Sequence, residues 1–144
     1  MRHCLVVAHQ TLDSPLLAEA MLEEVSQGAC AFHVVVPLLN RGESGLTWTE
    51  AEVRAIARDR LDQALGRFTA QGFAVVGEIG ANSSPVDSAG DVIRRHGPGF
   101  YDLVIVSTLP HAISRWLRID VPTRLERTTG VPVRHVEAPA HVDS

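Results

Sequence analysis

The side chains that could do chemistry in this chain follow three apolar segments, at the points where each segment gives way to polar residues. They offer hydroxyl, imidazole, amide and guanidinium groups: His9, Gln10, Thr11, Asn40, Ser107, Thr108, His111, Ser114 and Arg115. Together these groups can hold a polar or anionic small molecule. If the apolar segments are parallel strands, the set lies at the carboxyl edge of a sheet, where such folds bind ligands.

The same set offers few of the groups that catalysis needs. Neither Ser107 nor Ser114 stands in a G-x-S-x-G nucleophile elbow, and the turn has no carboxylate pair. His9 and His111 could share a metal ion only with a third ligand, and none is in sight. All 13 basic residues are arginine, which excludes Schiff-base and phosphate-loop lysine chemistry. We therefore expect no catalytic residue and no metal site, although a slow hydrolase that uses His9 or His111 as a base stays open.

Composition indicates one globular domain. The chain has 144 residues, of which 45% are hydrophobic, and a formal charge of −4, which argues against nucleic acid as a partner. No apolar stretch approaches the roughly 20 residues of a membrane helix, so we expect a cytoplasmic protein with no membrane partner. The domain is expected to cover residues 1–138, with a loosely held tail at 139–144. Cys4 and Cys30 lack metal spacing and are expected to be buried free thiols.

Five strand-like segments alternate with helical ones. The strands are predicted at residues 4–8, 32–36, 73–79, 102–107 and 131–136. Ser14-Pro15, Ser84-Pro85 and the capping box that runs from Thr49 to Glu52 predict three helix starts, and a fourth helix is interrupted at residues 119–122. This alternation predicts right-handed crossovers and an α/β fold with a doubly wound five-stranded parallel sheet.

The second half of the chain resembles a known family. Residues 102–107 (DLVIVS) with the turn after them, residues 125–136 with Pro132-Val133 entering the last strand, and residues 80–85 (GANSSP) are similar to segments of the universal stress protein family. The likeness covers nearly the whole chain. It implies a Rossmann-like, adenine nucleotide alpha hydrolase-like three-layer sandwich with strand order 3-2-1-4-5. The first and fourth strands would then be neighbours, and the side chains after them would line one crevice.

The chain departs from the phosphate-binding motif of that family, which is G-x-x-G, nine residues, then G-S or G-T. The motif glycines fall on Ser107, Pro110 and Asp120. Glycine lets backbone N–H groups approach a phosphate, whereas proline has no N–H and Asp120 adds negative charge. From this departure we expect a universal stress protein-like regulatory or interaction module with no cofactor, which does not bind ATP tightly but could hold a small polar ligand. The alternative is an ATP or AMP site with an atypical loop, in which His111 and Arg115 supply the charge.

Three further expectations concern surfaces. The resemblance implies a homodimer that pairs along the edge strand beginning at Val131 and ending at Val136. Residues 40–48 form a loop that is either a lid or a plain connector. His33, a single histidine within a strand, is expected to be a hydrogen-bonded structural residue.

Overall fold

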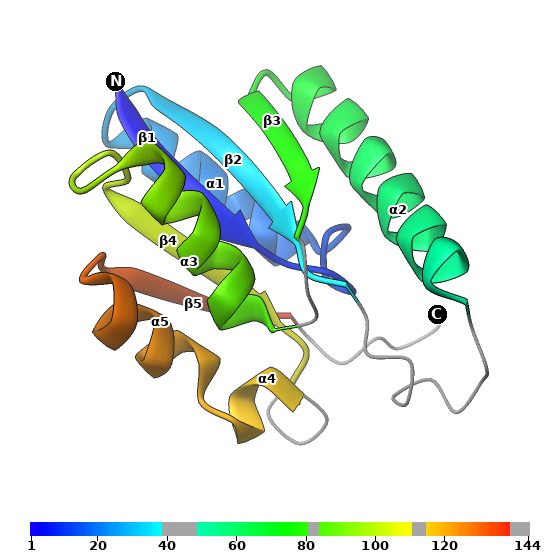
Figure 1. Ribbon diagram of the computed structural model, residues 1–144. Helices are drawn as coiled ribbons and strands as arrows, with labels where there is room; N and C mark the ends of the chain where they lie inside the picture. Colours follow the sequence, from blue (N-terminus) through cyan, green and yellow to red (C-terminus); the bar gives the residue numbers. More distant parts are fainter. Residues whose placement is uncertain (39–48, 81–83, 111–114, 139–144) are drawn as a thin grey trace.

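The computed structural model describes residues 1–38, 49–80, 84–110 and 115–138, without the side chains of residues 115 and 118. Its sheet is parallel throughout, with the order β3-β2-β1-β4-β5 (Figure 1). The strands are β1 (Arg2–Val7), β2 (Cys30–Val36), β3 (Ala74–Ile79), β4 (Leu103–Thr108) and β5 (Val133–Glu137). The predicted fold class and strand order are confirmed, including the adjacency of β1 and β4.

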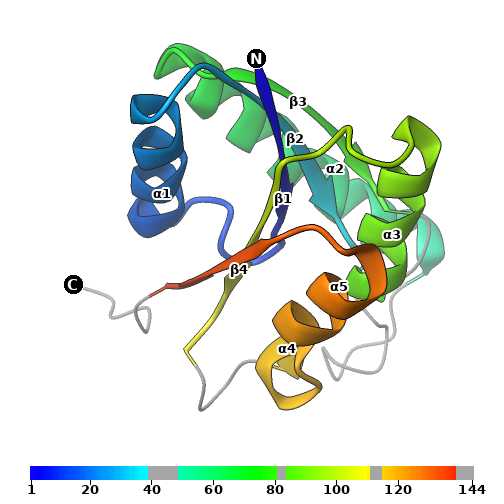
Figure 2. The same cartoon turned by 90° about the vertical axis from the view of Figure 1, so that its left-hand side faces the viewer.

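Helices cover both faces of the sheet (Figures 1 and 2). They are α1 (Pro15–Ser26), α2 (Glu50–Ala70), α3 (Pro85–His96), α4 (Arg115–Arg118) and α5 (Val121–Thr129). Core contacts place α1 and α2 on one face and α3 and α5 on the other. The helices that follow β1 and β4 therefore lie on opposite faces, which is the condition for a crevice between the two strand ends.

The helix starts follow local signals in the sequence. The Ser14 hydroxyl accepts a hydrogen bond from the Leu16 N–H, and the Ser84 hydroxyl accepts one from the Asp87 N–H. Thr49 and Glu52 form the predicted capping box at the start of α2. Each contact satisfies an N–H group that has no partner within the helix, so these starts do not depend on distant residues.

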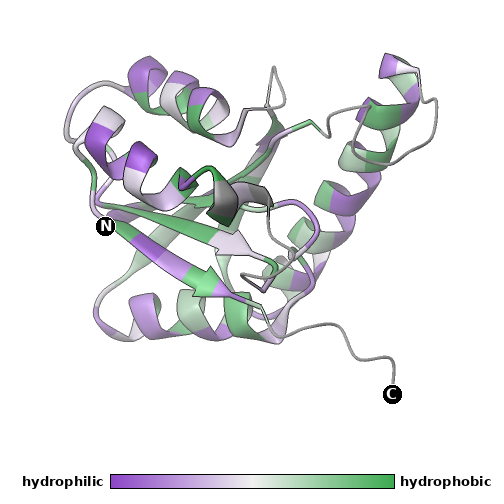
Figure 3. Ribbon diagram, turned by 90° about the horizontal axis from the view of Figure 1, so that it is seen from below, coloured by the Kyte–Doolittle hydropathy of each residue, from purple (hydrophilic) through white to green (hydrophobic). Residues whose placement is uncertain are grey.

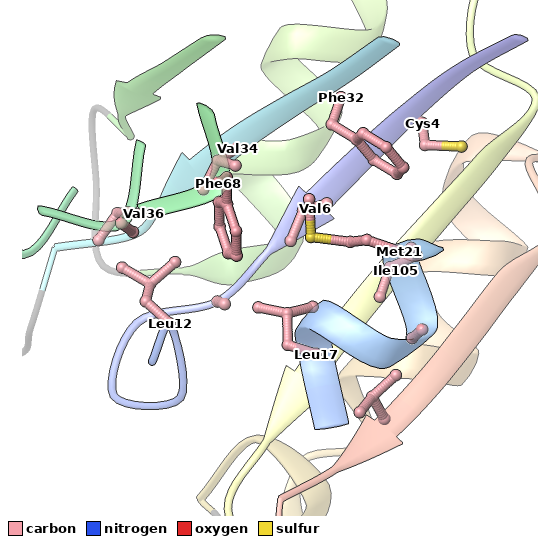
Figure 4. Packing of buried hydrophobic residues seen from close by; sticks show 14 of the residues in the cluster. Cys4, Val6, Leu12, Leu17, Met21, Phe32, Val34, Val36, Phe68 and Ile105 are labelled. Atoms are coloured by element: carbon pink, nitrogen blue, oxygen red, sulfur yellow. The ribbon is translucent and has the colours of Figure 1, made fainter. Parts of the chain in front are cut away.

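Two buried clusters sandwich the sheet. Cys4 and Val6 of β1, and Ala8 just after the strand, point toward α1 and α2. Figure 4 shows Val6 and Leu17 beside Met21 in this cluster. Leu5 and Val7 point toward α3 and α5. Because neighbouring residues of a strand face opposite sides, a central strand covered on both faces must be apolar throughout, as this one is. Both cysteines are buried and free, as expected.

Hydropathy differs between the strands and the helices. Colouring by hydropathy shows apolar segments along the strands and purple, hydrophilic stretches on the helices (Figure 3). No helix in the described ranges has the length and apolar character needed to cross a bilayer.

Each of the five predicted strands differs from the observed one by one or two residues at one or both ends, and the differences at β3 and β5 have a local cause. β3 begins at Ala74 instead of residue 73, because the Phe73 N–H is bonded to the Phe68 carbonyl at the end of α2. β5 begins at Val133 and ends at Glu137, instead of spanning residues 131–136. Pro132 still contributes its carbonyl, which accepts from the Val104 N–H, but its nitrogen cannot donate.

Gly77 and Gly66 provide a matched pair of substitutions. A methyl group on Gly77 would lie 2.7 Å from Leu61 Cδ1 and 3.1 Å from the Val34 carbonyl oxygen, whereas one on Gly66 meets nothing within 4 Å. We expect Gly77→Ala to lower the free energy of unfolding by about 1–3 kcal/mol through overpacking. Gly66→Ala, in the exposed side of α2, should raise it by about 0.5–1 kcal/mol. Urea unfolding measures both free-energy changes. If both substitutions stabilised the protein, or both destabilised it, this packing of β3 on α2 would be contradicted.

Candidate functional site

The candidate site lies beyond the carboxyl ends of β1 and β4. Of the nine predicted side chains, those of Asn40, His111, Ser114 and Arg115 lie outside the described residues. Gln10 is exposed, and His9, Thr11, Ser107 and Thr108 are buried.

Thr11 and Ser107 are brought together. Their hydroxyls share a hydrogen bond of 2.6 Å, and the two residues are 4% and 1% exposed. The bond joins the loop after β1 to the end of β4, across the position where the crevice was predicted. Each hydroxyl is thus already engaged with the other instead of with solvent.

Thr108 is separated from this pair by the sheet. Val106 belongs to the core cluster on the side of α5 and Ile105 to the cluster on the side of α1, so alternation places Thr108 and Ser107 on opposite faces. The Thr108 hydroxyl is 2.7 Å from Nε2 of His135 on β5. His135 was missing from the predicted site, although the parallel pairing of the last two strands could have suggested it.

His9 is the most unusual group at this edge. Its side chain is 4% exposed, and neither ring nitrogen has a hydrogen-bond partner among the described residues. Burial, with a smaller contribution from the positive charge of Arg60 on α2, lowers the pKa of His9 to about 4. The imidazole is therefore neutral at pH 7, so it supplies no charge for an anion and is a weak base there.

Asp120 keeps the backbone conformation of a glycine. It precedes α5 with φ 56° and ψ 50°, the left-handed region, and its side chain makes no capping bond. The resemblance placed the last motif glycine at this position. The chain has aspartate there, in a backbone conformation that glycine adopts most easily. The consequence is an exposed carboxylate at the start of α5.

A second polar cluster, absent from the predicted site, lies on the side of α3. His33 Nε2 is 2.8 Å from Glu78 Oε1, and His33 Nδ1 is 2.9 Å from the Tyr101 hydroxyl. A neutral ring that donates from Nε2 to Glu78 accepts from Tyr101 at Nδ1, so both nitrogens are satisfied. Arg95 of α3 also binds Glu78 at 2.6 Å. The structural role expected for His33 is confirmed, because the cluster ties β3 to β2 and α3.

Reactive or metal-binding groups are not gathered in the part of the chain that the structure describes. No cluster of three or more His, Cys, Asp or Glu residues there could hold a metal ion. Burial, followed by the neighbouring Cys30, raises the pKa of the Cys4 thiol to about 12. That thiol is therefore a packing group at neutral pH.

Comparison with known proteins supports the fold. No protein-family model and no curated protein matches the sequence. Among solved structures, a protein of the universal stress protein family from Burkholderia pseudomallei is 19% identical, with a TM-score of 0.58 over 93% of this chain and 94% of that one. A universal stress protein from Archaeoglobus fulgidus is 14% identical, with a TM-score of 0.60 over 94% and 93%.

A third similar structure carries a ligand. A universal stress protein family protein from Arabidopsis thaliana, solved with AMP bound, is 12% identical, with a TM-score of 0.63 over 96% of this chain and 92% of that one. The chain therefore has the fold of universal stress proteins over nearly its whole length, as the resemblance implied.

The Thr11–Ser107 bond can be tested with a double-mutant cycle. Thr11→Val or Ser107→Ala alone leaves one buried hydroxyl unpaired, which should lower the free energy of unfolding by about 1–3 kcal/mol. The double variant should cost clearly less than the sum, because it removes both hydroxyls. Thr128→Val, exposed on α5, is the control and should change stability by less than about 0.5 kcal/mol. Strictly additive costs in urea unfolding would argue against the bond.

Proposed function

We propose that this chain is a universal stress protein-like regulatory or interaction module that does not bind ATP tightly. The observation that carries the proposal is the buried hydrogen bond between Thr11 and Ser107. These two hydroxyls stand between β1 and β4, where the fold offers its ligand crevice. A ligand that used them would first have to break their mutual bond, which costs part of its binding free energy.

The charges of the described residues also disfavour a triphosphate. Asp120 places a carboxylate at the start of α5, where the helix dipole would otherwise favour an anion. His9 is neutral at pH 7. Pro110, just after β4, has no N–H to offer a phosphate oxygen. A small polar ligand with little negative charge fits these groups better than ATP does.

The second candidate is a nucleotide-binding module with an atypical loop. It draws on the AMP bound to the Arabidopsis protein of the same fold. AMP has one phosphate, so it would meet less repulsion from Asp120 than ATP would. An enzyme is less favoured, because the buried and neutral His9 is a poor base at pH 7.

Calorimetry with ATP and AMP in the presence of Mg²⁺ tests the proposal. We expect no ATP binding with Kd below about 10 μM at pH 7. Asp120→Asn removes the carboxylate at nearly constant size and should strengthen any weak ATP binding more than AMP binding. Submicromolar ATP binding by the unsubstituted chain would refute the proposal, and AMP binding in that range would establish the second candidate.

We further propose that the module forms a homodimer through β5. This strand is the last in the sheet order, and an edge strand is a template for pairing with another chain. Sedimentation velocity should then give a dimer at micromolar concentration. Val133→Pro, which removes an N–H that faces away from β4, should shift it toward monomer, whereas Val75→Pro at the equivalent position of the opposite edge strand β3 should not. A monomer at all concentrations would contradict the dimer.

A further inference from the structure

The loop between β1 and α1 is held closed by a few buried contacts at the carboxyl edge. Leu12 is 4% exposed and packs in the core cluster on the side of α1 and α2 (Figure 4). Arg67 of α2 donates to the Leu12 carbonyl at 3.4 Å, and the Thr11 hydroxyl is bonded to Ser107. The loop is thus anchored to α2 on one side and to β4 on the other.

His9 is buried within this closed arrangement without the contacts that usually accompany a buried imidazole. Both ring nitrogens lack partners among the described residues. A buried polar group without a hydrogen bond is costly, and that cost disappears when the ring reaches water. The closed loop therefore contains one residue that is better solvated when the loop opens.

The cost of burying His9 depends on pH, because the imidazole can take up a proton. The charged groups of the described residues that bear on His9 are few: Arg60 from α2 disfavours the protonated ring, and no carboxylate is found to favour it. Ser107 and Thr108, at the end of β4, are uncharged. A protonated His9 would be a buried, unpaired cation near a second cation.

We propose that residues 9–12 form an acid-released latch, which is closed over the crevice between β1 and β4 when His9 is neutral and opens when His9 is protonated. This inference rests on the proposed function, because it describes the regulation of the same crevice. Opening moves His9 into water and separates the Thr11 and Ser107 hydroxyls. Both hydroxyls then become available to a ligand.

The direction and size of the effect follow from proton linkage. The pKa of His9 is about 4 in the closed state, and an exposed histidine has a pKa of about 6.5. The closed state is therefore favoured fully above about pH 6.5 and loses that advantage as pH falls toward 4. Between pH 7 and pH 5 the opening equilibrium should increase about twentyfold.

Amide hydrogen exchange of the full chain, without nucleotide, tests the latch at pH 7, 6 and 5. After correction for the intrinsic exchange rate, a peptide covering residues 8–14 should show the increase, and peptides from the centre of β2 should not. His9→Gln stays neutral throughout this range and should remove the pH dependence. Thr11→Val, which lacks the hydroxyl bond, should raise opening severalfold at pH 7.

Arg60→Gln gives a second measurement if the His9 variant folds poorly, because Arg60 lies on the exposed side of α2. Removing its charge should make the increase smaller, most clearly when the series is extended to pH 4, where the closed form itself begins to take up the proton. Arg127→Gln, the same charge change on α5, and His33→Gln, at a half-buried histidine on β2, should leave the increase unchanged.

Three results would overturn the latch: exchange at residues 8–14 that does not depend on pH, an equal pH dependence in His9→Gln, or an equal increase in β2. The last result would mean global unfolding in acid. Tight ATP binding at pH 7 would refute the proposed function but would leave this nucleotide-free exchange measurement unaffected, so the two failures can be told apart.

Discussion

The structure depends on the burial of β1 between two strands and two layers of helices. Cys4 to Ala8 have no exposed surface, and β1 pairs in parallel with β2 on one side and β4 on the other. Burial on both faces fixes which side chains meet α1 and α2 and which meet α3 and α5, because a shift of one residue would exchange the two sets. It also places the loop after β1 at the middle of the carboxyl edge.

At the carboxyl edge, polar residues therefore follow directly after a fully buried strand. Residues 9–11 leave a strand that is buried on every side, and two of them stay buried. Thr11 finds a partner in Ser107, whereas His9 finds none among the described residues. The chain thus has the fold of universal stress proteins, and at its carboxyl edge Thr11 and Ser107 are engaged with each other while His9 is buried in neutral form.

The turn before α5 has a backbone conformation that is unusual for the residue found there. Asp120 adopts a left-handed conformation, which glycine adopts most easily. Aspartate tolerates this region better than most residues, so the turn can form without a glycine. The Asp120 carboxylate makes the start of α5 less favourable for an anion, because the helix dipole there is positive.

Local signals in the sequence determined the elements of this protein. The capping residues Ser14, Thr49 and Ser84 predicted the starts of three helices. The uninterrupted apolar run of β1 indicated a strand covered on both faces. The resemblance implied the strand order. The errors at Phe73 and Val131 lie at strand ends, where a backbone group can serve either element.

The tertiary structure alone decided which polar groups meet. His33 contacts Tyr101 and Glu78 from segments more than 40 residues away, and Thr11 meets Ser107 but not the adjacent Thr108. The absence of a hydrogen-bond partner for His9 among the described residues is likewise visible only in the folded chain. Caps and apolar periodicity arise from contacts within a few residues, so a linear sequence displays them. The pairing of buried polar groups depends on loop path and sheet register, which appear only when the chain is folded.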